Sequence, residues 1–216
     1  MKSKLNYQIL LLLFIICVPF ITAQTSIRVT LLGTGAPVPS IERFGPSILV
    51  EAGGQKLLFD CGRGAAQRLW QLKIPLGKID VLFLTHLHSD HIVGIPDVWL
   101  TGWIPAAYGR RENPLKVFGP AGTKEMMEYL VKSFSWDINT RSKENNKVDS
   151  GAVVNATNIT EGFVWEKNGI RVTPFIVRHA DFIDSALGYR IDYNGHSVIL
   201  SGDTRYSENL IKYAKG

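Results

Sequence analysis

Cysteine is scarce in this chain of 216 residues, which holds two, Cys17 and Cys61. Because Cys17 lies in an N-terminal segment that we expect to be removed, the mature chain keeps one thiol and can form no internal disulfide. Disulfide-framework classes are therefore excluded. The composition shows no strong bias, with 45% hydrophobic residues, 20% charged residues, 20 glycines and 10 prolines. These values exclude disordered and collagenous classes. The length fits one globular domain or part of a larger one.

Blocks of like charge are also lacking. No run of five like charges occurs, and the formal charge of the whole chain is +5. Without Lys2 and Lys4 of the leader, 22 basic residues stand against 19 acidic ones, so the mature charge is +3. Proteins that track a phosphate backbone usually cluster Lys and Arg into a patch. This balance by itself does not indicate nucleic acid as a partner.

No hydrophobic run is long enough for a typical membrane helix. The apolar run from Ile9 to Ile21 spans 13 residues, short of the roughly 20 that such a helix needs. A basic start before this run and Ala23 after it are the parts of a secretory signal peptide; an uncleaved anchor is the alternative. We expect a signal peptide over residues 1–23, cleavage after Ala23, and a periplasmic or secreted product with no membrane attachment.

Residues 24–216 combine short apolar runs with helical periodicity and contain no internal repeat. Apolar runs and alternation predict strands over 27–33, 47–51, 56–60, 79–85, 115–118, 163–166, 170–177, 187–193 and 197–201. Helical spacing predicts helices over 64–72, 90–99 and 123–134. The polar stretch 139–160 predicts a surface excursion. This mixture indicates an α/β or α+β fold, with one domain over 24–216.

The sequence His86-Leu-His88-Ser-Asp90-His91 follows a predicted buried strand and holds three of the five histidines. Alternate residues at a strand end share a face, so His86 and His88 can point the same way. Imidazole and carboxylate groups are good zinc ligands, and a pair of metal ions needs such a cluster together with a bridging group. The pattern therefore predicts a metal site, with a histidine-bearing surface loop as the alternative.

The chain resembles the metallo-β-lactamase superfamily, and within it the ribonuclease Z-like and arylsulfatase-like metallohydrolases. The resemblance covers residues 27–216 and is carried by the segments Leu32–Gly35, Leu58–Gly62, His86–His91, Leu187–Arg190 and Ser201–Thr204, together with His179. It implies a four-layer αββα sandwich. The chain ends soon after Asp203, whereas the resemblance implies further strands, helices and a final histidine. We therefore expect the C-terminal part of the fold to be missing from this sequence.

The resemblance also implies a set of metal ligands. By matching position, His86, His88 and His179 would hold a first zinc, Asp90 and His91 a second, and Asp203 would bridge the two. A complete site would hold two zinc ions. Because the final histidine is not in this sequence, we expect one zinc to bind firmly and the second weakly.

Two aspartates have further implied roles. Asp60 matches the supporting aspartate of the family, which orients a metal-bound imidazole or the loop beneath it. Asp90 matches the catalytic aspartate that manages the proton of the attacking water. Turn formation is the alternative for Asp60 and Asp203, and a strand-end histidine without a ligand is the alternative for His179. We expect His196 in an exposed hairpin.

The implied chemistry is ester hydrolysis without a Ser or Cys nucleophile. The short stretch between Arg190 and Gly202 leaves no room for the arm with which ribonuclease Z proteins grip RNA. With the leader and the weak charge, this favours an exported, arylsulfatase-like hydrolase of a small anionic sulfate or phosphate ester. The alternatives are a ribonuclease Z-type enzyme for tRNA 3′ ends and an inactive zinc-binding protein. Trp99 and Trp103 would either line a substrate pocket or pack in the core.

Overall fold

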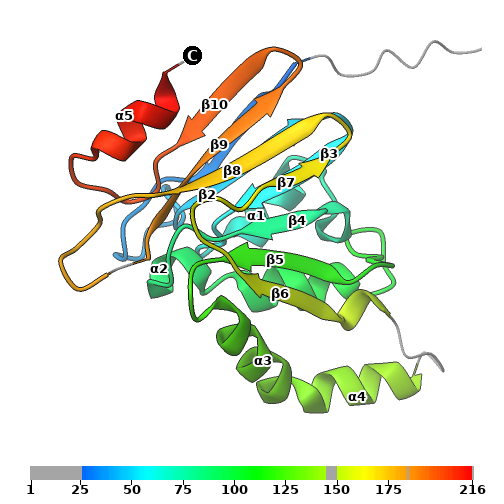
Figure 1. Cartoon of the computed structure of the whole chain (residues 1–216). Coiled ribbons are helices and arrows are strands. Elements are labelled where there is room, and N and C mark those ends of the chain that lie inside the picture. Colours follow the sequence, from blue (N-terminus) through cyan, green and yellow to red (C-terminus); the bar gives the residue numbers. More distant parts are fainter. Residues whose placement is uncertain (1–25, 145–149, 184, 216) are drawn as a thin grey trace, which may run out of the picture.

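The computed structural model describes residues 26–144, 150–183 and 185–215 (Figure 1). The strands are β1 Arg28–Gly33, β2 Ser47–Ala52, β3 Gln55–Phe59, β4 Val81–Phe83, β5 Leu115–Gly119, β6 Val154–Asn158, β7 Trp165–Lys167, β8 Ile170–Ile176, β9 Leu187–Tyr193 and β10 His196–Leu200. The helices are α1 Ala65–Gln71, η1 Leu76–Lys78, α2 Ser89–Ile92, η2 Asp97–Thr101, α3 Thr123–Ser133, α4 Ser135–Glu144, η3 Ser150–Ala152 and α5 Glu208–Ala214.

The strands form two sheets. One has the order β1-β2-β3-β4-β5-β6, and the other has the order β10-β9-β8-β7. In the first sheet, β3, β4, β5 and β6 pair in parallel, whereas the pairs in the second sheet are antiparallel. The carboxyl ends of β3 and β4 therefore lie at one edge of the molecule, and their amino ends lie at the opposite edge.

Three hydrophobic clusters separate four layers. The first lies between the six-stranded sheet and the helices on its outer face, and it includes Leu58, Leu69 and Met127. The second lies between the two sheets, where Phe59, Phe83 and Tyr189 contact one another. The third lies between the four-stranded sheet and α5. Figure 1 shows α3 and α5 on opposite outer faces, so the predicted αββα arrangement is confirmed.

Most predicted elements are found close to their expected bounds. The hairpin of β2 and β3 turns at Gly53 and Gly54, whose φ angles of 50° and 73° favour glycine. The predicted helices over 64–72 and 123–134 are found as α1 and α3. His196 is exposed at the start of β10, as expected for a hairpin residue.

Two predictions about secondary structure are wrong. The stretch 139–160 is not merely an excursion, since it contains the end of α4 and all of β6. Because β6 is a short edge strand whose apolar positions are Val154 and Ala156 alone, its alternation is too short to indicate a strand within a polar stretch. The helix predicted over 90–99 is divided into α2 and η2. A Cβ on Gly94 would lie 2.3 Å from the Gly62 carbonyl oxygen, so the chain is packed tightly at this break.

The predicted signal peptide, residues 1–23, and the bond after Ala23 lie outside the described residues. Within the part of the chain that the structure describes, no helix has both the length and the apolar character required to cross a bilayer.

Candidate metal centre

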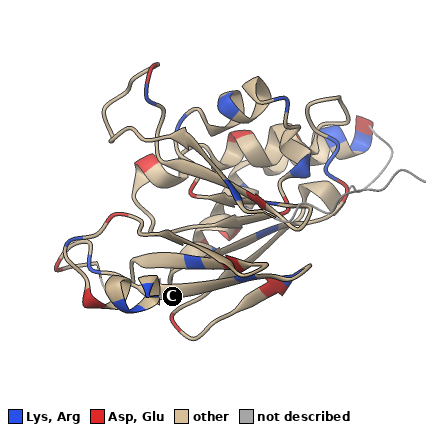
Figure 2. Cartoon of the chain, turned by 90° about the horizontal axis from the view of Figure 1, so that it is seen from above, with Lys and Arg blue, Asp and Glu red and all other residues tan. Residues whose placement is uncertain are grey.

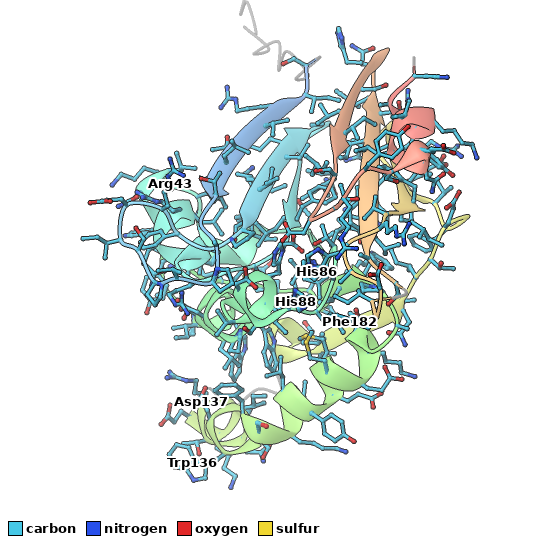
Figure 3. The ribbon with its side chains drawn as sticks, turned by 90° about the vertical axis from the view of Figure 1, so that its left-hand side faces the viewer. Arg43, His86, His88, Trp136, Asp137 and Phe182 are labelled. Atoms are coloured by element: carbon cyan, nitrogen blue, oxygen red, sulfur yellow. The ribbon has the colours of Figure 1, made fainter. Side chains whose placement is uncertain are left out.

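The predicted metal residues come from loops at one edge of both sheets. Asp60 directly follows β3, and the segment 85–91 follows β4, which is parallel to β3. In open α/β sheets, the carboxyl ends of parallel strands are the usual place for a site. His179 follows β8 and Asp203 follows β10 in the other sheet. Figure 3 shows His86 and His88 together at this edge.

Three histidines converge in one group. His86 Nε2 lies 3.0 Å from His88 Nδ1, and His179 Nε2 lies 3.2 Å from the same His88 atom. The three side chains form a group whose ligand atoms all lie within 4.8 Å of one another. Imidazole nitrogens bound tetrahedrally to one zinc at roughly 2.0–2.1 Å would lie about 3.3 Å apart, so this triad fits the ion.

A second group adjoins the first. It combines His86, His91 and Asp203, and His91 Nε2 lies 3.5 Å from Asp203 Oδ2. Asp90 does not meet the same close spacing, but its Oδ2 lies 3.8 Å from His91 Nε2. His91 Nε2 is buried and lacks a hydrogen-bond partner among the described residues. A buried nitrogen without a partner is costly, and a bound cation would satisfy it, so this group also fits a metal.

Asp60 supports the metal residues through hydrogen bonds with Thr85 and His91. Its carboxylate accepts hydrogen bonds from the Thr85 backbone N–H and from the Thr85 hydroxyl, each at 2.8 Å. Its Oδ2 also lies 2.8 Å from His91 Nδ1, which leaves His91 Nε2 facing Asp203. This is the arrangement in which a carboxylate fixes the tautomer and orientation of a ligand histidine. Asp60 therefore lies where its predicted supporting role requires.

Thr85 extends the support to His86, a link that the sequence analysis missed. Its hydroxyl donates to Asp60, and it lies 3.0 Å from His86 Nδ1, from which it can accept. A hydroxyl has one donor and two acceptor positions, so both contacts can form together. His86 Nε2 is then directed into the group. The signal in the sequence was a hydroxyl residue between a buried strand and the first histidine.

The pKa values of the two buried histidines, His86 and His91, shift in opposite directions. Burial, with His91 and His88 nearby, lowers the pKa of His86 to about 3, so His86 is neutral. Burial also opposes charge on His91, but its interactions with Asp203 and Asp60 outweigh burial and raise its pKa to about 10. A proton and a metal ion compete for the same nitrogen lone pair, so the carboxylates that attract the proton also favour a cation.

Two close backbone approaches shape the loops. Gly202 has φ 58°, and a Cβ there would lie 3.0 Å from the Thr85 Cβ and 2.9 Å from the Leu187 carbonyl oxygen. A Cβ on Gly62 would lie 2.4 Å from the Asp90 carbonyl oxygen. Glycine at these positions lets the Asp203 turn and the loop of Asp60 approach the metal residues.

The expectation that Trp99 and Trp103 line a substrate pocket is wrong. Their exposed fractions are 0% and 1%, so neither ring reaches a ligand at the surface. Trp99 packs in the cluster between the six-stranded sheet and the helices, and its indole N–H donates to the Ala152 carbonyl oxygen at 3.0 Å. The core alternative is therefore correct, because helical spacing after the metal loop turns both rings inward.

The chain is similar to a known protein family and to curated relatives. The family model described as anti-Pycsar protein Apyc1 matches residues 27–215. The ribonuclease Z of Mycolicibacterium gilvum (strain PYR-GCK) is 40% identical over 190 residues, which are 88% of this chain and 66% of that relative. The chain thus spans slightly less than two thirds of the relative's length.

Two solved structures share the fold. The metallo-β-lactamase fold protein YhfI of Bacillus subtilis aligns with a TM-score of 0.68 and 20% identity, over 88% of this chain and 68% of YhfI. The short form of human tRNase Z aligns with a TM-score of 0.61 and 21% identity, over 86% of this chain and 73% of the human chain.

Proposed function

The chain belongs to the anti-Pycsar protein Apyc1 family and to the ribonuclease Z-like part of the metallo-β-lactamase superfamily, and on that premise we propose that the intact protein is a metal-dependent phosphodiesterase. The observation that carries the proposal is the convergence of His86, His88 and His179, with nitrogen separations of 3.0 and 3.2 Å. Three imidazole nitrogens at this spacing suit zinc.

The residues divide between two ions in this proposal. His86, His88 and His179 would hold the first zinc, and His91 with Asp203 and Asp90 would hold the second. Asp203, whose Oδ2 lies 3.5 Å from His91 Nε2, would be the ligand shared by the two sites. When bound, such a metal pair lowers the pKa of a shared water and neutralises the charge that develops on phosphodiester oxygens.

The remaining chemistry belongs to side chains of the chain itself. Asp90 is 8% exposed and lies beside His91, where its carboxylate can receive a proton from the attacking water and return it to the leaving oxygen. Asp60 and Thr85 keep His91 and His86 in fixed orientations throughout. Preorganised groups of this kind lower the cost of rearrangement during the reaction.

The proposed substrate is an RNA phosphodiester, with the 3′ end of a tRNA precursor as the first candidate. The reason is that the relative sharing 40% identity is named a ribonuclease Z. This shifts our expectation from sulfate esters to phosphodiesters. A small phosphodiester is the second candidate, because β9 and β10 are joined by a tight turn at Asn194 and Gly195 that carries no RNA-gripping arm.

The test compares three substrates with the zinc-loaded full chain: a tRNA precursor with a 3′ trailer, bis(p-nitrophenyl) phosphate, and p-nitrophenyl sulfate. We expect cleavage of a phosphodiester and loss of that cleavage in His88→Ala. Cleavage of the tRNA precursor at its 3′ end selects the first candidate, and turnover of bis(p-nitrophenyl) phosphate alone selects the second. Turnover of the sulfate alone would refute the proposal.

Export remains part of the proposal because the compartment limits the substrate. A protein cleaved after Ala23 and exported would not meet tRNA precursors inside the cell, so export favours the small phosphodiester. N-terminal sequencing of the natural product distinguishes the cases: Gln24 as the first residue supports export, and Met1 on an intracellular protein supports the RNA substrate.

A further inference from the structure

A basic cleft lies at the edge of the molecule opposite the metal centre. It has a volume of about 550 Å³ and is lined at the amino ends of β4 and β5, by Val81 and Lys116, and by Trp165 of β7. The metal residues follow the carboxyl ends of β3 and β4, so the two sites lie at opposite ends of the parallel strands. The cleft is therefore separate from the proposed active site.

Positive charge dominates this cleft. Its lining includes six basic residues: Lys56, Lys78, Arg110, Arg111, Lys116 and Lys167. The acidic residues in the lining are Asp80 and Glu112, so basic residues exceed acidic ones by four, whereas the excess over the whole chain is five. Figure 2 shows basic and acidic positions interspersed over most of the ribbon, so this local excess is unusual for the molecule.

Most of these cations are not neutralised by the protein. Lys56 Nζ lies 3.8 Å from Glu51, and Asp80 is engaged by the Lys56 backbone N–H at 2.8 Å. By contrast, the exposed side chains of Lys78, Arg110, Lys116 and Lys167 have no hydrogen-bond or ion-pair partner within the described ranges. Four flexible donors thus border one cavity.

A buried cation lies behind them. Arg111 is 4% exposed and donates to the carbonyl oxygens of Leu76 and Ile79 at 2.9 and 2.8 Å. Its Nε has no hydrogen-bond partner, and in the described part of the chain no carboxylate forms a salt bridge with it; Asp80 acts on it only through a coulombic interaction. A buried charge without a close ion pair is costly and leaves a positive potential in the adjoining cavity. An anion bound in the cleft would reduce that cost.

We propose that this cleft binds a small ligand that carries two or more phosphate groups, either free pyrophosphate or the phosphate end of a nucleotide. Lys and Arg are the usual partners of phosphate, and several of them around one cavity suit more than one phosphate group. The volume of 550 Å³ lies within the range of about 300–1,000 Å³ that is common for small-molecule sites. The proposal does not depend on the activity of the metal centre.

The test measures binding of pyrophosphate and of ADP to the full chain by calorimetry, with a chelator present to remove metal-bound phosphate. The cleft variant is Lys116→Glu with Lys167→Glu. The control is Lys132→Glu with Lys143→Glu, an equal charge change on exposed positions of α3 and α4. We expect the cleft variant to lose at least about 10-fold in affinity and the control to lose little, because Lys132 and Lys143 do not line the cleft and salt screens exposed charges that do not contact the ligand.

Each other outcome is decisive. Retained binding in the milder pair Lys116→Gln with Lys167→Gln, when circular dichroism shows a native fold, would overturn the site. Equal losses in cleft and control variants would reduce the effect to general electrostatics and also overturn it. Loss of binding in His88→Ala alone would place the phosphate at the metal centre. Binding of a 12-nucleotide RNA through Lys116 and Lys167 without binding of pyrophosphate or ADP would overturn the small-ligand assignment.

Discussion

The two halves of the candidate metal centre differ in how firmly they are held. The half formed by Asp60, His86 and His91, which follow β3 and β4, is buried: His86 is 2% exposed, His91 1% and Asp60 5%. The half contributed by the second sheet is open, since the side chain of Asp203 is 50% exposed and His179 is partly exposed. Hydrogen bonds to the Asp60 carboxylate and the Thr85 hydroxyl orient the buried half, whereas loop geometry places the open half.

This difference shows where the site is preorganised. Buried polar groups must find partners, and in the buried half they find one another at 2.8 to 3.0 Å. The other ring nitrogens of this half are turned toward the open half: His86 Nε2 lies 3.0 Å from His88 Nδ1, and His91 Nε2 lies 3.5 Å from Asp203 Oδ2. The buried half is therefore a rigid template to which His88, His179 and Asp203 add ligands.

The largest expected effect comes from removing a ligand of the buried half. His86 belongs to both groups of ligand atoms, so His86→Ala should weaken both metal positions. We expect zinc affinity to fall by more than about 100-fold, the upper end of the loss that follows when only a supporting residue is removed. Zinc titration with a competing chelator measures this. An affinity within 10-fold of the unmodified chain would contradict the ligand assignment.

A smaller loss is expected when the support is removed and the ligands remain. Asp60→Ala should keep zinc binding but weaken it by roughly 10- to 100-fold. It should also reduce the free energy of unfolding by about 1–3 kcal/mol, because His91 Nδ1 and Thr85 lose a buried partner. Denaturant unfolding and zinc titration measure the two effects.

The Asp60→Ala variant both removes a charge and places alanine at a positive φ, and Asp60→Asn distinguishes these two effects. Asp60 has φ 57°, a conformation that Asn also tolerates. Similar losses in the Ala and Asn variants would attribute the effect to the carboxylate. An Asn variant with unchanged zinc affinity would show that the charge of Asp60 does not support His91.

A still smaller loss of zinc affinity is expected at Thr85, which links Asp60 with His86. Thr85→Val keeps the shape but removes the hydroxyl, and we expect a loss of roughly 10-fold in zinc affinity, the lower end for a supporting residue. Thr85→Ser keeps the hydroxyl and is the matched control, with little expected change. Equal affinities in the Val and Ser variants would show that the hydrogen bond to His86 does not matter for the metal.

The smallest effect is expected outside both halves. His196 is exposed at the β9–β10 turn, away from the other histidines. His196→Ala should leave zinc affinity unchanged and alter unfolding free energy by less than about 0.5 kcal/mol. A clear loss of zinc in this variant would show that histidine content, and not the geometry of the site, governs metal binding.

The sequence predicted the part of this picture that depends on local pattern. The motif from His86 to His91 and the hairpin of β2 and β3 follow from residue types at fixed spacing, and both are found. Bringing His179 and Asp203 to the motif required the family resemblance, because the second sheet places them there from distant positions. The link through Thr85 required atomic positions, since many strand ends carry a threonine without such a role.

Other features were predicted wrongly or not at all, for physical reasons that a single sequence does not reveal. β6 lies at a sheet edge and has two apolar positions, so its alternation is too short to stand out from the polar residues around it. Trp99 and Trp103 were equally compatible with a pocket and with a core, and their exposed fractions of 0% and 1% decide for the core. The basic cleft gathers residues from β3, β5, β7 and the loops between them, so it forms no charge run in the sequence.

The central claim is that His86, His88 and His179 together hold a metal ion. The most direct measurement is a Co²⁺ titration of the full chain followed by visible absorption, because the band intensity and position report coordination geometry and ligand type. We predict a saturable, tetrahedral-type spectrum in the unmodified chain that is lost in His88→Ala and in His179→Ala and kept in His196→Ala. The same spectrum in the unmodified chain and in the His88 and His179 variants, or no saturable spectrum in any of them, would contradict the account.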